Sequence, residues 1–125
     1  MHVLGILAAA FVMQFHTPTG NIGCAYVSDP GFGGPSLRCD ILSGLKPKPQ
    51  RRCALDLTGF SLRPTGRASV VCAGDTAVDR RSPVLRYGQR WSRGGFTCTS
   101  RTAGLRCRNR SAHGFFLSRA HSYGF

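Results

Sequence analysis

The sequence contains no glutamate, and its five aspartates are scattered along 125 residues. A glycoside hydrolase of the common kind needs two carboxylates beside one bond, so this distribution argues against that reaction. No Gly-x-Ser-x-Gly nucleophile elbow occurs. The closest pair of cysteines, Cys98 and Cys107, is too widely spaced for the knuckle typical of structural zinc sites. We therefore predict no catalytic residue of these types, no metal and no cofactor.

Long apolar runs are also missing. The longest, Met1–Phe15, is shorter than the roughly 20 residues of a membrane-spanning helix. It resembles the end of a secretory signal, because small residues, Ala8–Ala10, follow the apolar stretch. No Lys or Arg precedes the run, so a misplaced start or a buried first element of the domain is the alternative. We predict a signal segment over residues 1–14, no transmembrane helix, and one domain over residues 15–125.

The six cysteines are an even count in a short chain, which is typical of disulfides formed in an oxidising compartment. We therefore expect a secreted, periplasmic or cell-envelope protein. Among the connectivities that six cysteines allow, we predict the one in which each pair lies across a predicted hairpin: Cys24–Cys39, Cys53–Cys72 and Cys98–Cys107.

Two of these hairpins repeat one pattern, in which an apolar-x-Cys strand is followed by a Leu-Arg-Cys strand. They are Ile22–Tyr26 with Leu37–Ile41, and Phe96–Ser100 with Gly104–Asn109. Because successive side chains of a strand point to opposite faces, the cysteines and their apolar neighbours should face inward. The outward residues of the second hairpin are then Thr97, Thr99, Arg106 and Arg108.

The remaining strands follow from alternation and from Gly or Pro turns. We predict them at Cys53–Leu57, with Cys53, Leu55 and Leu57 inward, and at Phe60–Arg63, Arg67–Cys72, Pro83–Gln89 and Gly114–Ser118. The predicted fold class is therefore all-β. It is a small antiparallel sandwich or open barrel built from hairpins and held by three disulfides.

Seventeen basic residues against five acidic ones give the chain a net charge of +12. Such an excess predicts a polyanion partner, such as nucleic acid, an acidic cell-envelope polymer or an anionic membrane. The alternative is that the charge only keeps the surface soluble, since the arginines are spread along the chain. The candidate ligand-binding residues, selected for charge and aromatic content, are Trp91, Arg90, Arg93, Arg106, Arg108, Arg110 and His113.

Seven strings, taken together, resemble a family of small secreted or lipid-anchored bacterial proteins classed only as a domain of unknown function. They are TPTGNIGCAY, LRCDI, VCAGDT, LRYG, GGFTCTS, GLRC and HGFFLSR, within Thr17–Arg119. The chain departs from the family where Leu57 replaces a tryptophan after Asp56. The resemblance implies an extracytoplasmic location and a disulfide-bonded β-fold, and it implies no activity.

We therefore expect a monomeric, non-enzymatic, extracytoplasmic module that binds an anionic ligand or stabilises an envelope assembly. Two alternatives stay open. One is a small cationic hydrolase resembling a ribonuclease, with His113 and His16 as its acid/base pair. The other is an inhibitor of an extracellular protease.

Overall fold

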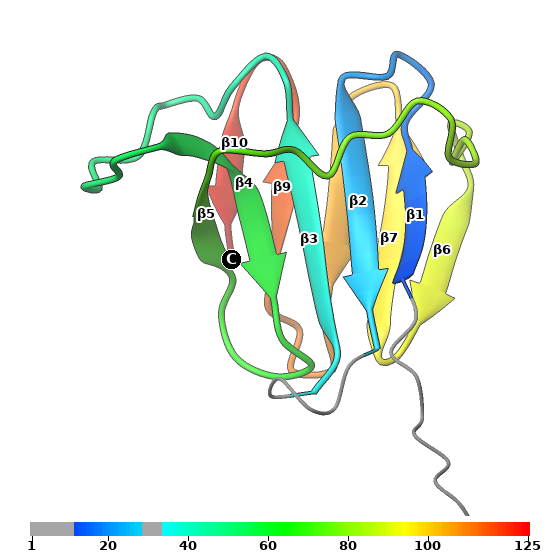
Figure 1. The fold of residues 1–125 in the computed structure, drawn as a ribbon. Helices are drawn as coiled ribbons and strands as arrows, with labels where there is room; N and C mark the ends of the chain where they lie inside the picture. Colours follow the sequence, from blue (N-terminus) through cyan, green and yellow to red (C-terminus); the bar gives the residue numbers. More distant parts are fainter. Residues whose placement is uncertain (1–11, 29–33) are drawn as a thin grey trace, which may run out of the picture.

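The computed structural model describes residues 12–28 and 34–125, which form ten strands in two five-stranded antiparallel sheets (Figure 1). The N-terminal sheet contains β1 (Val12–His16), β2 (Ile22–Val27), β3 (Ser36–Ile41), β4 (Asp56–Leu62) and β5 (Ser69–Ala73). The C-terminal sheet contains β6 (Arg90–Arg93), β7 (Phe96–Arg101), β8 (Gly104–Arg108), β9 (Gly114–Leu117) and β10 (Ser122–Gly124). The predicted all-β class is confirmed, and the sheets form a sandwich rather than a closed barrel.

Both sheets are simple meanders with the same internal order, so each strand of one has a counterpart in the other. The inner face of each sheet carries the same cross-strand row, an aromatic ring, two cysteines and a phenylalanine. In the N-terminal sheet the row is Phe15, Cys24, Cys39 and Phe60. In the C-terminal sheet it is Trp91, Cys98, Cys107 and Phe115.

These two rows pack against each other in the core. The rings of Phe15 and Trp91 lie 5.1 Å apart, and those of Phe60 and Phe115 stack at 5.5 Å. Between them the Sγ atoms of Cys39 and Cys107 approach to 4.0 Å. The predicted pairs Cys24–Cys39 and Cys98–Cys107 are confirmed, and all four of these cysteines are fully buried. The core is thus two stacked hairpin disulfides flanked by aromatic pairs.

The third predicted disulfide, Cys53–Cys72, is also confirmed, but the strand predicted at Cys53–Leu57 is wrong. β4 begins only at Asp56, and Leu55 is 60% exposed instead of inward. Alternation assigns faces only within a paired strand, and β4 pairs with β5 only from Asp56 onward. The residues before Asp56 therefore have no sheet face to follow.

The strand predicted at Pro83–Gln89 is wrong as well. Only Val84 forms a bridge there, parallel to His16. The backbone N–H of Gln89 instead bonds to the carbonyl of Arg86, which closes a turn. Residues 83–89 are the end of the long connection between the two sheets. The connection as a whole crosses the outer side of β3, β2 and β1 (Figure 1). We call residues 74–84 the strap.

The edge strand β1 is the first element of the described residues. Val12, Met13 and Gln14 pair with β2, so the boundary predicted between residues 14 and 15 falls inside β1. A cleavage near Ala10 would leave this strand whole. Across residues 12–28 and 34–125, no helix is long and apolar enough to cross a membrane. The three disulfides are consistent with an extracellular or other oxidising environment.

Candidate functional site

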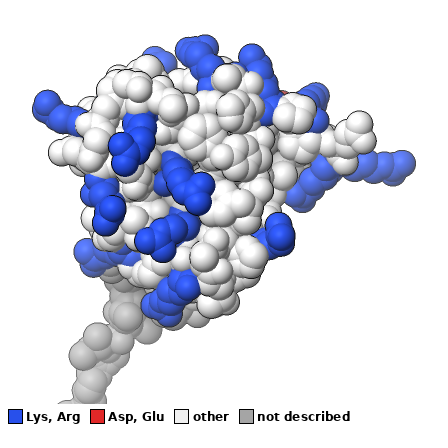
Figure 2. Space-filling view, turned by 180° about the vertical axis from the view of Figure 1, so that it is seen from behind, with Lys and Arg blue, Asp and Glu red and all other residues white. Residues whose placement is uncertain are grey.

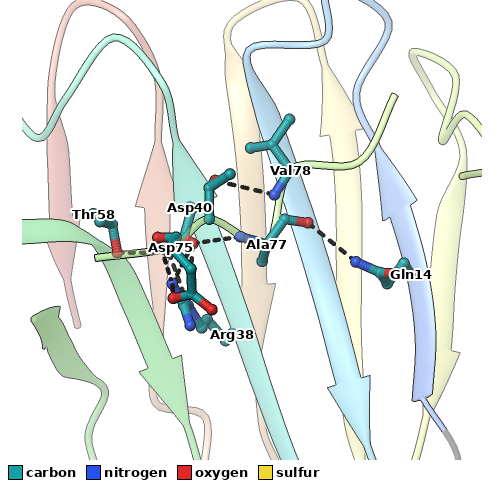
Figure 3. Close-up of polar contacts among 8 residues, drawn as sticks. Gln14, Arg38, Asp40, Thr58, Asp75, Ala77 and Val78 are labelled. Atoms are coloured by element: carbon teal, nitrogen blue, oxygen red, sulfur yellow. Dashed lines mark hydrogen bonds and ion pairs between the residues drawn. The ribbon is translucent and has the colours of Figure 1, made fainter. Parts of the chain in front are cut away.

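The outer face of the N-terminal sheet is closed by the strap, which a buried carboxylate holds in place (Figure 3). Asp40, on β3, is only 1% exposed. Its oxygens accept hydrogen bonds from the Ala77 amide at 2.7 Å, the Thr58 hydroxyl at 3.0 Å and the Arg38 Nε at 3.1 Å. A buried carboxylate is stable only when it is paired and hydrogen-bonded in this way. Asp40 therefore has a structural role as an anchor.

Arg38 extends this anchor to the start of the strap. Its guanidinium lies 2.8 Å from Asp40 and 3.1 Å from Asp75. Burial alone would lower the pKa of Arg38, but the hydrogen bonds and charges of the two carboxylates outweigh it and raise the pKa above its ordinary value. Farther along, the Gln14 amide donates to the Ala77 carbonyl at 3.4 Å.

Gly23, on β2, lets the strap lie directly on the sheet. A Cβ atom at this position would stand 2.5 Å from the Cα of Val78. The strap is therefore packed backbone to backbone over β2. This arrangement leaves little room for a ligand between the strap and β2.

A hollow lies beside this anchor, between the 42–55 connection, the start of β4 and the first residues of the strap. Its volume is about 580 Å³. Charges of both signs line it, including Lys48, Arg51, Asp56 and Asp75. The hollow therefore has no net preference for an anion or a cation.

The C-terminal sheet has an open outer face that no segment of the described chain crosses (Figures 1 and 2). One cross-strand row on this face runs through all five strands: Arg90, Thr99, Arg106, Phe116 and Tyr123. The next row contains Ser92, Thr97, Arg108 and Gly114. We call these two rows the open face. The predicted outward position of Thr97, Thr99, Arg106 and Arg108 is confirmed.

The acidic and basic residues are distributed unevenly between residues 1–79 and residues 80–125, although the arginines are spread along the chain. Residues 1–79 contain seven basic and all five acidic residues, whereas residues 80–125 contain ten arginines and no acidic residue. Figure 2 shows Lys and Arg side chains spread over the open face, with hardly any acidic surface in view. The positive charge therefore belongs mainly to the C-terminal sheet and its connections.

The structure brings only three of the predicted ligand-binding residues together on the open face: Arg90, Arg106 and Arg108. Trp91 has the opposite orientation, because its half-buried ring packs against Phe15 and Tyr26 at the edge of the core. Arg93, Arg110 and His113 lie away from the two rows, at the end of β6 and in the β8–β9 turn.

The two histidines proposed as an acid/base pair have separate structural partners. The Nδ1 atom of His16 lies 3.1 Å from the Ser82 hydroxyl, at the end of the strap. The Nδ1 atom of His113 lies 3.2 Å from the carbonyl oxygen of Phe125. Each ring thus braces a different segment, and no contact joins the two within the described chain.

Sequence reasoning missed an aromatic cluster on the open face, formed by Phe116, His121, Tyr123 and Phe125. Tyr123 stacks on two neighbours, since the centre of its ring lies 5.4 Å from that of Phe116 and 5.8 Å from that of His121. The guanidinium of Arg106 lies 4.0 Å from the centre of the Phe125 ring. The alternation of rings in HSYGF was the signal that could have revealed this cluster.

One group of potential metal ligands occurs among the described residues, and it consists of Cys24, Cys39 and Cys107. A cysteine binds a metal as a thiolate, and these sulfur atoms are already joined in disulfides. The group is therefore part of the core and offers no site for an ion in the oxidised protein.

The chain belongs to a family of unknown function, DUF6636, which matches residues 2–125. No curated protein and no solved structure matches the chain significantly.

Proposed function

We propose that this protein is a non-enzymatic, extracytoplasmic module that binds a polyanion of the cell envelope on the open face. The observation that carries this proposal is an exposed, arginine-rich sheet face within residues 80–125, which contain no acidic residue. Such a face attracts anions over distances of about 10 Å at ordinary salt.

The open-face arginines are also available to a ligand. Arg90 and Arg108 are exposed, and within the part of the chain that the structure describes their guanidinium groups have no ion pair or hydrogen bond. On the N-terminal sheet, by contrast, Arg38 is fully engaged by two carboxylates. A polyanion would therefore displace only water and counterions from Arg90 and Arg108.

The separate bracing of His16 and His113 supports a binding function over the ribonuclease-like alternative, which needs both rings at one phosphate. Incubation with RNA tests this point. We expect no cleavage, and cleavage that His113→Ala abolishes would contradict the non-enzymatic proposal.

The direct test is binding to heparin, a sulfated polysaccharide, over a series of salt concentrations. We expect affinity to fall steeply as salt rises. The double variant Arg106→Glu/Arg108→Glu should lose at least tenfold in affinity. A matched control, Lys48→Glu/Arg52→Glu, makes the same change in net charge on the 42–55 connection and should lose much less. Binding that ignores salt, or an equal loss in both variants, would overturn the proposal.

A further inference from the structure

A groove at one end of the sandwich carries a more specific inference, which rests on the proposed function. Four turns meet there: the β1–β2 turn, the 86–89 turn, the β7–β8 turn and the β9–β10 turn. They enclose a hollow of about 260 Å³. We call this hollow the end groove.

The end groove is lined by positive charge and hydroxyl groups. Arg101 and Arg119 contribute two exposed guanidinium groups, and no carboxylate lines the hollow. Neither guanidinium has an ion pair or hydrogen bond to another described residue. Thr19 and Thr102 add hydroxyl groups. Arginine is suited to carboxylate because its planar fork can donate two parallel hydrogen bonds.

Tyr87 provides an aromatic ring in the same groove. It is 45% exposed and stacks on no other ring among residues 12–28 and 34–125. A tyrosine of this kind offers an apolar face together with a polar hydroxyl. One cyclic, hydroxylated unit that carries an anionic group would match the ring, the hydroxyl groups and the two guanidinium groups at once.

The end groove is joined to the open face. A second hollow of about 190 Å³ lies between Arg106 and Phe116 on that face, and both hollows share Arg101, Ala103 and Gly104 in their lining. A polymer that lies along the arginines of the open face could therefore continue over Gly104 into the end groove. The two sites form one path.

The rings on the open face argue against single-stranded nucleic acid as this polymer. Proteins that bind such strands stack successive bases on free aromatic faces. Here Phe116, Tyr123 and His121 stack on one another, so bases could stack between them only if these contacts were broken. Tyr87 is a single ring with no such partner among the described residues, so it suits one unit and not a series of bases.

We propose that the end groove binds an acidic sugar residue, of the uronic-acid class, within a polyanionic glycan that also contacts the open face. Arg101 and Arg119 would bind its carboxylate, and Tyr87 would stack on its ring. The remainder of the glycan would meet Arg106 and Arg108.

The test compares a short ligand with a long one. A trisaccharide of galacturonic acid can place one uronic-acid unit in the end groove. Heparin also contains uronic acids, but the salt dependence of its binding reports on the arginine contacts and not on Tyr87. We expect Tyr87→Ala to weaken trisaccharide binding at least tenfold and to leave the salt dependence of heparin binding unchanged. Leu42→Ala is the control for the loss of an exposed apolar side chain, because Leu42 is 52% exposed and lies outside both the end groove and the open face. Circular dichroism and thermal melting establish that both variants are folded.

The outcomes separate the two proposals. If wild-type protein binds heparin but not the trisaccharide, or if Tyr87→Ala has no effect, the acidic-sugar inference is wrong while the proposed function stands. If wild-type protein does not bind heparin, the proposed function itself fails. If a single-stranded oligonucleotide of equal charge binds more tightly than the glycan and depends on Tyr87, the ligand is a nucleic acid and the inference is overturned.

Discussion

The inner faces of the two sheets carry the same row of an aromatic ring, two cysteines and a phenylalanine, whereas their outer faces carry opposite charges at one pair of equivalent positions. Asp40 follows Cys39 on β3, and Arg108 follows Cys107 on β8. Asp40 binds the strap, while Arg108 is exposed. Tight packing constrains the inner row of both sheets, and the outer rows are free to serve different roles.

A second pair of equivalent positions explains why the strap lies on one sheet only. Gly23 precedes Cys24, and Thr97 precedes Cys98. The strap needs a glycine at the first position, because a Cβ there would meet Val78. Thr97 has a side chain instead, and its hydroxyl lies 3.1 Å from that of Ser92. The C-terminal sheet is therefore unsuited to a strap packed in the same way.

The largest expected effect tests the equivalence of the inner rows. Replacing either core pair, Cys24→Ala/Cys39→Ala or Cys98→Ala/Cys107→Ala, should lower the free energy of unfolding by about 3 kcal/mol, since each disulfide restricts the unfolded chain. Urea denaturation measures both. Losses that differ by several kcal/mol between the two pairs would show that the rows are not equivalent.

A smaller effect concerns the glycines that precede the core phenylalanines, Gly59 and Gly114. A Cβ atom at either position would overlap the carbonyl oxygen of the neighbouring cysteine, Cys39 or Cys107. Gly59→Ala and Gly114→Ala should therefore each cost roughly 2–3 kcal/mol, as overpacking in a core does. Gly74→Ala is the control for the loss of a glycine, because a Cβ there meets only side-chain atoms of Leu55, at ordinary contact distances of 3.8 and 3.9 Å. If only one of Gly59→Ala and Gly114→Ala kept the stability of the wild type, the two sheets would not be equivalent at this position.

The next effect separates the outer faces. Asp40→Asn should lower the free energy of unfolding by about 2 kcal/mol, because it removes the charge that balances the partly buried Arg38. Hydrogen exchange of the Ala77 amide should become faster in this variant. The equivalent change on the open face, Arg108→Gln, should alter stability by less than about 0.5 kcal/mol. Equal losses would contradict the assignment of Asp40 to structure and Arg108 to binding.

Much of the fold could be predicted because its signals are local. The three disulfides and both hairpins followed from cysteine spacing and from alternation between Gly and Pro turns. Alternation failed at Leu55 and at Pro83–Gln89, where the chain pairs with no long strand. Alternation with a period of two predicts which side chains are buried only where the segment is paired with a neighbouring strand in a sheet.

The candidate site was predictable only in part. Arg106 and Arg108 were placed correctly because they alternate with Leu105 and Cys107 in one strand. Trp91 and Arg90 were both selected for aromatic content or charge, yet neighbouring residues of a strand point to opposite faces. The end groove combines residues from four turns, so no local pattern could have revealed it.

By itself, the sequence determined the all-β class, the hairpin disulfides and the excess of positive charge, since each depends on composition or on neighbours along the chain. The tertiary structure decided which outer face is covered and which is open. That choice depends on contacts between distant residues, such as Asp40 with Ala77, which are 37 positions apart. The strap crosses only the N-terminal sheet, and the arginines of the open face on the other sheet stay exposed.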